Sequence, residues 1–145
     1  MPDIQINIVA IVLAVIANFF LGFVWYSFFF RQSWAREMGF DPNESPDKSV
    51  MIRGMSLSVL GNLLLAWVFF HNIAVWNPVT WGLPAVESNA FATAGEAAFF
   101  TWIGFYVPVL FNSVAWEKKS WKLFGINASY HFVSLLLVAT IITLM

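Results

Sequence analysis

The sequence predicts an all-α polytopic membrane protein, with four transmembrane helices that form two antiparallel hairpins within one domain, residues 1–145. Hydrophobic residues make up 60% of the chain and charged residues only 10%, whereas a soluble domain carries about a quarter charged residues. Four stretches reach the roughly 20 apolar residues that a helix needs to cross the hydrocarbon core. These stretches are Ile4–Phe30, Met51–Trp76, Ala90–Trp116 and Leu123–Met145.

The basic residues predict the orientation of these helices. All seven Lys and Arg residues lie in two short stretches, which contain Arg31, Arg36, Lys48 and Arg53, and then Lys118, Lys119 and Lys122. Cytoplasmic loops of membrane proteins are enriched in Lys and Arg. We therefore expect loops 31–50 and 117–122 in the cytosol, both termini and the middle loop outside, and the chain in the plasma membrane or the bacterial inner membrane.

The first two helices carry matching ridges of small and polar residues. Small residues let helices approach closely in lipid, and an amide can add an interhelical hydrogen bond. Asn18 and Asn62 lie within about one turn of each other in depth, at about 1.5 Å per residue, so a contact between them is feasible. Whether these amides only join the helices or also line a ligand pathway stays open. The ridges repeat at every fourth position and consist of Ala10, Ala14, Asn18 and Gly22, and of Gly54, Ser58, Asn62 and Ala66.

The first cytosolic loop contains a predicted interfacial helix over residues 33–39, closed by Gly39. Trp34, Met38 and Phe40 are expected to rest in the headgroup region. The outer loop that follows the second helix is rich in turn formers and contains two Trp residues, Trp76 and Trp81. It is expected to lie along the outer interface, where indole rings are favoured.

Glu96 in the third helix and His71 in the second are both predicted near the outer boundary. Polar residues are costly within the bilayer and often functional there. The two side chains are therefore candidates for a pair that lies on a ligand pathway. The alternative is that Glu96 only meets water at the outer interface.

A second polar group is predicted near the inner boundary. Asn127 and His131 are four positions apart on one face of the fourth helix, and Asn112 lies at a similar depth on the third. Pro108 is expected to kink the third helix and free a carbonyl there. This group either lines a pathway or joins helices by hydrogen bonds.

Enzymatic chemistry is not expected from this sequence, and no catalytic residue is assigned. The chain has no cysteine, no metal-binding or nucleotide-binding motif, and no patch basic enough for nucleic acid. His71 and His131 differ in depth by about two turns or more, too far apart to ligate one haem. We expect no cofactor and no metal, and a lipid bilayer and other copies of the chain as partners.

Aromatic and polar residues at fixed spacing resemble a known family. Asn18, Gly22, Trp25-Tyr26, Phe30, Trp34 and Met38-Gly39 open the pattern, and Trp116-Glu117-Lys118-Lys119, Trp121-Lys122-Leu123-Phe124, Ile126-Asn127-Ala128 and Tyr130 close it. These motifs resemble the small multi-helix membrane protein family catalogued as domain of unknown function 1761. The resemblance covers nearly the whole chain, implies the membrane architecture and transfers no catalytic residue. The chain departs from the family pattern at Ser27–Phe30, where a Pro or Gly is expected and neither occurs.

Part of the first segment is also similar to a later one. Gly22, Phe29 and Trp34 match Gly104, Phe111 and Trp116 at one constant offset. Duplicated hairpins related by an axis along the membrane normal would give this pattern.

Two classes of function remain. In the first, the protein is a carrier, channel or membrane ligand-binding protein acting as an oligomer, and its polar side chains converge on a hydrated cavity. In the second, it is a non-catalytic interaction or assembly subunit, and the same side chains saturate one another in a dry core. Four helices enclose almost no lumen, so transport is expected to need an oligomer.

Overall fold

The computed structural model describes residues 3–145, and this part of the chain is helical without any strand. Four helices are long and apolar enough to cross a membrane: Ile8–Phe29, Lys48–Trp76, Ala90–Ala115 and Trp121–Leu144. The predicted all-helical class is thereby confirmed, and the four candidate spans have the length and composition expected of a multi-pass membrane protein. Each helix begins and ends within a few residues of its predicted boundary.

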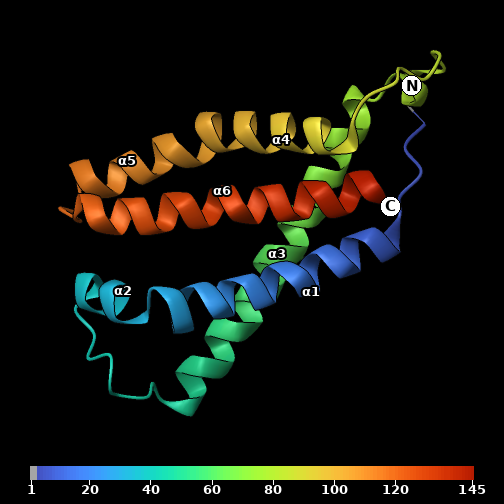
Figure 1. The fold of residues 1–145 in the computed structure, drawn as a ribbon. Helices are drawn as coiled ribbons and strands as arrows, with labels where there is room; N and C mark the ends of the chain where they lie inside the picture. The colour runs from blue at the N-terminus through green and yellow to red at the C-terminus, as the bar shows by residue number, and fades with distance from the viewer. Residues whose placement is uncertain (1–2) are drawn as a thin grey trace.

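Two of these long helices contain a π-helical segment. In chain order the elements are α1 (Ile8–Val24), the π-helix η1 (Trp25–Phe29), α2 (Arg31–Met38), α3 (Lys48–Trp76), the 3₁₀-helix η2 (Pro78–Trp81), α4 (Ala90–Thr101), the π-helix η3 (Trp102–Tyr106), α5 (Val107–Ala115) and α6 (Trp121–Leu144) (Figure 1).

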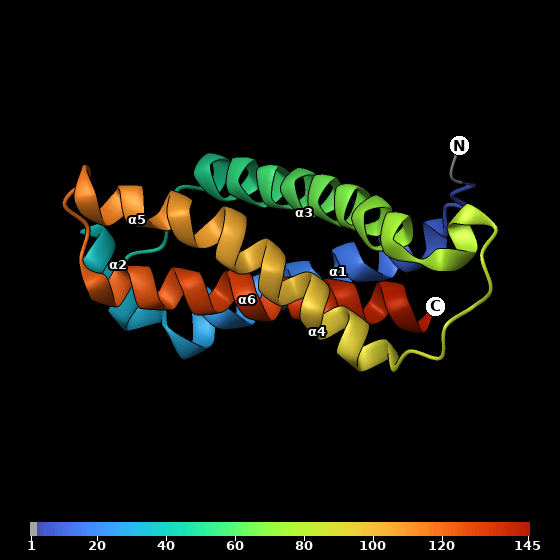
Figure 2. The same ribbon diagram turned by 90° about the horizontal axis from the view of Figure 1, so that it is seen from above.

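Helix α6 is the centre of the bundle. It packs against α1, α4, α5, α2 and α3, and successive long helices run in opposite directions (Figure 1). Helix α3 crosses α1 at an angle and diverges from it towards one end of the molecule, as the views in Figures 1 and 2 agree. This divergence determines where the candidate site lies.

Side-chain caps explain where two helices begin. The Asn7 side chain accepts a hydrogen bond from the Ala10 backbone N–H at 3.1 Å, so α1 begins at Ile8 and not at the predicted Ile4. Ser120 Oγ accepts a hydrogen bond from the Leu123 N–H at 3.0 Å, and α6 therefore begins at Trp121. Gly39 ends α2 in the left-handed conformation, φ 77°, as predicted.

The π-helix η3 accounts for the bend predicted at Pro108. Proline removes a backbone N–H and its ring clashes with the carbonyl four residues earlier. In this chain the π-helical turn directly precedes α5, and Pro108 lies in the first turn of that helix. Helices α4 and α5 consequently run in different directions (Figure 2).

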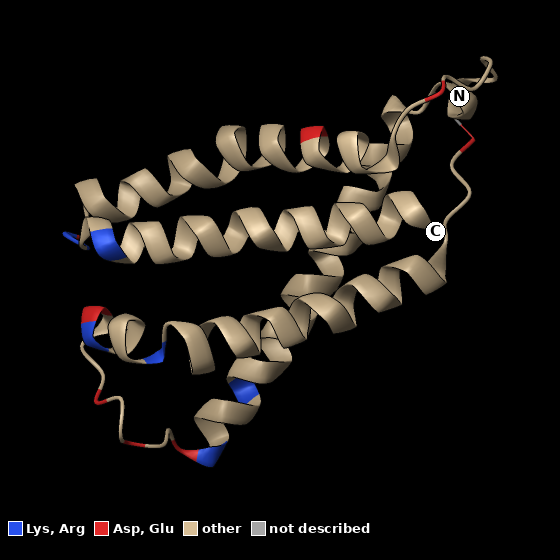
Figure 3. Ribbon diagram, in the orientation of Figure 1, with Lys and Arg blue, Asp and Glu red and all other residues tan. Residues whose placement is uncertain are grey.

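Charge separates the two ends of the bundle (Figure 3). We call the end that carries the Lys and Arg residues the basic end. The other end, the terminal end, holds both chain termini, since Asn7 Nδ2 donates to the Met145 carbonyl at 3.2 Å. At the basic end Glu37 connects the two predicted basic loops: Ser120 Oγ donates to its carboxylate at 2.5 Å and Lys122 Nζ lies 3.8 Å from it.

The apolar core lies in the half of the bundle nearer the terminal end. Its buried residues come from α1, α3, α4 and α6, and Ala14, Ala66 and Leu135 are each 0% exposed. Small residues at the crossing of α1 and α3 allow these helices to approach closely there. No comparable contact between α1 and α3 is made towards the basic end.

Candidate functional site

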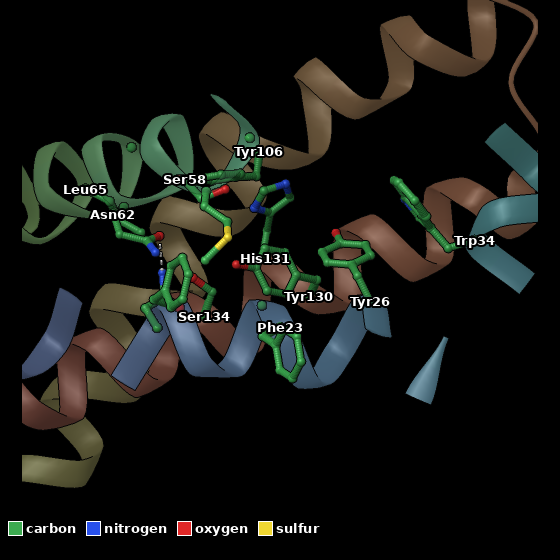
Figure 4. Close-up of a pocket in the computed structure, with 16 residues that line it drawn as sticks. Phe23, Tyr26, Trp34, Ser58, Asn62, Leu65, Tyr106, Tyr130, His131 and Ser134 are labelled. Carbon is green, nitrogen blue, oxygen red and sulfur yellow. Dashed lines mark hydrogen bonds between the residues drawn. The ribbon is translucent and has the colours of Figure 1, made fainter. Parts of the chain in front are cut away.

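A pocket of about 560 Å³ lies between α1, α3, η3 and α6 on the side of the basic end. We call it the tyrosine pocket, because all three tyrosines of the chain, Tyr26, Tyr106 and Tyr130, line it (Figure 4). The remaining lining residues are polar, aromatic, small or aliphatic, and they are Asn18, Phe19, Gly22, Phe23, Trp34, Gly54, Met55, Ser58, Gly61, Asn62, Leu65, His131 and Ser134.

The pocket exists because the two predicted ridges meet over only part of their length. Ala10, Ala14 and Ala66 are fully buried, and Asn18 Nδ2 donates to Asn62 Oδ1 at 2.9 Å. The contact that the sequence made feasible is therefore present. Beyond Asn62, towards the basic end, α3 diverges from α1.

Gly22, Gly54 and Ser58 do not make the ridge contacts predicted for them. Gly54 and Ser58 are exposed, and a Cβ added to Gly54 would meet nothing within 4 Å. Gly22 instead faces α6, where an added Cβ would lie 3.0 Å from Tyr130 Oη. The divergence of α3 thus leaves the small faces of both helices bordering the tyrosine pocket.

The tyrosines form an aromatic layer between α1 and α6. The ring centroids of Tyr26 and Tyr130 are 4.9 Å apart, and those of Tyr106 and His131 are 4.6 Å apart. Trp34 packs edge-on to Tyr26 at 5.5 Å. Trp34 thus contacts the lining of the pocket, in addition to lying near the basic end where the headgroup region was expected.

Asn127 and His131 lie at different parts of this layer. The Tyr26 hydroxyl donates to Asn127 Oδ1 at 3.1 Å, so Asn127 holds one wall of the pocket without lining it. His131 lines the pocket itself and also lies 5.2 Å from the Tyr130 ring. In Figure 4 the His131 ring faces the same space as the rings of Tyr106 and Tyr130.

The polar groups of the pocket do not saturate one another. Asn18 is 1% exposed, and its Oδ1 is a buried acceptor without any hydrogen-bond partner in the described part of the chain. The side chains of His131, Tyr106 and Tyr130 likewise make no hydrogen bond to another described residue. Buried polar groups normally have such partners, so Asn18 Oδ1 is an exception, while the partly exposed hydroxyl and imidazole groups are free to bind water or a ligand.

None of the residues that line the tyrosine pocket is Lys, Arg, Asp or Glu. The chain offers no thiolate either, since it has no cysteine. The chemistry available in the pocket is therefore hydrogen bonding by amide, hydroxyl and imidazole groups, together with contact to aromatic faces.

The predicted outer pair is not formed. His71 Nδ1 makes its 2.8 Å contact with the Trp67 carbonyl on its own helix. Glu96 is exposed and borders a second pocket of about 900 Å³ at the terminal end, which His71 does not line. Contact between α3 and α4 is slight, and no hydrogen bond or ion pair joins His71 to Glu96.

Asn112 does not join Asn127 and His131 as predicted. It is exposed on α5, does not line the tyrosine pocket, and makes no side-chain hydrogen bond in the described part of the chain. The reason is the π-helix η3 before it. A π-turn inserts an extra residue, which rotates the side chains that follow it by about 100° relative to regular helical spacing.

The tyrosines and Trp34 were not predicted as site residues. Tyr and Trp are enriched at membrane interfaces, so their positions alone indicate lipid contact as readily as a pocket. A usable signal was present in the motifs that carry the family resemblance, which include Trp25-Tyr26, Trp34 and Tyr130.

Comparison with known proteins gives one match. Residues 9–143 match the family described as Protein of unknown function (DUF1761). No curated protein and no solved structure shows significant similarity to the chain. Because the match extends over nearly the whole sequence, as the motifs suggested, the chain belongs to the DUF1761 family.

Proposed function

We propose that the protein is a membrane carrier or ligand-binding protein whose binding site is the tyrosine pocket. The observation that carries this proposal is the set of pocket side chains without protein partners, above all the buried Oδ1 of Asn18. A dry core of an assembly subunit is expected to pair such groups. A cavity that admits water or a ligand does not require that pairing.

A permanently open channel is less well supported than a carrier or receptor. The cluster of buried residues around Ala14, Ala66 and Leu135 closes the bundle between the tyrosine pocket and the terminal end. Packed apolar side chains therefore separate the pocket from the terminal end. Passage through the protein would require a rearrangement of these helices, as in alternating access.

We place the basic end in the cytosol, because Lys and Arg are retained on that side, and the protein in the cell membrane. The tyrosine pocket then opens towards the cytosol and the inner leaflet. We also propose that the protein acts as a homo-oligomer, because four helices leave wide apolar faces exposed. The expected mass in mild detergent is that of a dimer or a larger assembly.

The alternative, a non-catalytic interaction subunit, is favoured by one observation. Residues 48–61 of α3 are all exposed, so this half of the helix is free to contact another protein. The two functions differ in whether water reaches the inner face of α3.

Cysteine labelling separates them, since the chain has no native cysteine. Gly61 lines the pocket and has open space for a side chain, whereas its neighbour Leu60 is 50% exposed but does not line the pocket. In lipid nanodiscs, a charged methanethiosulfonate should modify Gly61→Cys at least tenfold faster than Leu60→Cys, because only a hydrated thiol forms the reactive thiolate. Equal, slow rates would contradict a hydrated pocket and favour the interaction role.

A further inference from the structure

We infer that the tyrosine pocket binds an uncharged amphiphile with a hydroxyl-bearing ring, which enters from the membrane between α1 and α3 and donates a hydrogen bond to Asn18 Oδ1. This inference rests on the proposed function and specifies its ligand. It follows from the charge, the hydrogen-bonding capacity, the aromatic walls and the opening of the pocket.

The charge of the lining favours a neutral ligand. No Lys, Arg, Asp or Glu borders the pocket. An ion that left water for this site would lose its hydration without meeting an opposite charge, which is strongly unfavourable. A neutral molecule does not pay that penalty.

The hydrogen-bonding groups require a donor on the ligand. Asn18 Oδ1 is buried and has no donor, while Asn62 Oδ1 already accepts from Asn18 Nδ2. An unsatisfied buried acceptor is unfavourable, and an O–H of the ligand that reached Asn18 Oδ1 would satisfy it. His131 and Ser134, which also line the pocket, are available for a second polar group.

The walls suit a flat ring. Tyr26, Tyr106, Tyr130 and Trp34 present aromatic surface from η1, η3, α6 and α2 around one space. Offset and edge-on contacts between aromatic rings are favourable beyond the area they bury. A ring with a hydroxyl group matches both the aromatic surface and the lone acceptor.

The opening of the pocket is apolar. Phe23 on α1 and Met55 on α3 line the pocket and are 63% and 51% exposed. Both lie in helices that cross the membrane, so the gap between them faces lipid chains. An amphiphile dissolved in the bilayer reaches such an opening with its alkyl chain still in lipid.

The test uses four probes with the same alkyl chain, added to the protein in nanodiscs, with empty nanodiscs as the partition control. They are 4-octylphenol, octylbenzene, octyltrimethylammonium and nonanoate. We expect 4-octylphenol to bind at least tenfold more tightly than the other three and to slow the modification of Gly61→Cys. Asn18→Leu should weaken 4-octylphenol binding at least tenfold, while Asn112→Leu, on the exposed side of α5, should leave it unchanged.

A pocket-filling variant keeps the binding test decisive if Asn18→Leu does not fold. Gly61→Leu occupies the space from α3 without removing the Asn18–Asn62 bond, and it should also abolish binding. Equal or tighter binding of octyltrimethylammonium would overturn the inference in favour of cation recognition by the aromatic rings. Fast modification of Gly61→Cys without 4-octylphenol binding would overturn the ligand class and leave the proposed function intact. Slow modification of Gly61→Cys together with no 4-octylphenol binding would overturn the ligand class and the proposed function.

Discussion

Asn18 combines a structural and a proposed binding role in one side chain. Its Nδ2 joins α1 to α3 through Asn62 at 2.9 Å, and its Oδ1 remains free beside the tyrosine pocket. An interhelical hydrogen bond in a membrane protein contributes on average only about 0.6 kcal/mol. The bond therefore orients the amide more than it stabilises the bundle, and it leaves the carbonyl oxygen without a donor of its own.

His131 differs from Asn18 in having no hydrogen bond within the described chain. We therefore predict that His131→Leu lowers the free energy of unfolding by no more than the order of 1 kcal/mol, because no protein partner is left unpaired. Binding of 4-octylphenol, or flux of a transported solute into liposomes, should fall at least tenfold.

Thermal melting in mild detergent, measured beside ligand binding, separates these effects, and His131→Gln serves as the hydrogen-bonding control. A large loss of thermal stability with unchanged binding would make His131 a packing residue.

Single residues were predictable where regular helical spacing holds. Asn18 and Asn62 lie in uninterrupted parts of α1 and α3, so counting turns placed them at matching depth, and their contact is present. Asn112 follows a π-turn and is exposed, so it does not join Asn127 and His131 although its depth matches theirs. Tyr106 belongs to that π-helix, so regular helical spacing could not predict that its ring lines the pocket.

At the scale of elements, both π-helices begin with a tryptophan that binds α6. Trp25 Nε1 donates to the Ile126 carbonyl at 3.3 Å, and Trp102 Nε1 donates to the Ala128 carbonyl at 2.8 Å. Each π-turn thus lies where an indole reaches across to the central helix. In η1 it also allows the chain to change direction at Phe30 (φ −115°, ψ 11°) without the Pro or Gly expected there.

The different lengths of these two hydrogen bonds predict different losses of stability for the Trp→Phe variants. Trp102→Phe should lower the free energy of unfolding by about 1–2 kcal/mol, because it removes a short bond in a half-buried site. Trp25→Phe should cost less, because its bond is longer. Trp116 is 82% exposed, so Trp116→Phe serves as the matched control and should change stability by less than about 0.5 kcal/mol.

Reversible unfolding in mixed detergent micelles measures all three variants. Equal effects of Trp102→Phe and Trp116→Phe would show that the indole bond to α6 does not stabilise the bundle.

For the whole molecule, the number and extent of the helices were predictable because the membrane requires long apolar stretches. Their packing was not, because apolar faces in lipid do not identify their neighbours. Helix α6 contacts every other long helix, whereas α3 barely meets α4 or α5. A duplication about an axis along the membrane normal would require the two hairpins to occupy equivalent positions. These contacts show that their positions are not equivalent.

The orientation of the molecule can be tested with exposed loop residues. Ser45 lies between α2 and α3 at the basic end, and Ser88 precedes α4 on the side of the terminal end; both are exposed. In intact cells, an impermeant thiol reagent should label Ser88→Cys and not Ser45→Cys, because cytoplasmic loops are enriched in Lys and Arg and we therefore propose a cytosolic basic end.

Permeabilised cells provide the control for this orientation, since both cysteines should then react. Labelling of Ser45→Cys alone in intact cells would reverse the orientation. The tyrosine pocket opens near the basic end, so this result would also move its opening from the inner to the outer leaflet. The ligand would then have to be sought among amphiphiles of the outer leaflet, while the charge and hydrogen-bonding requirements set by Asn18 and the tyrosines would stay the same.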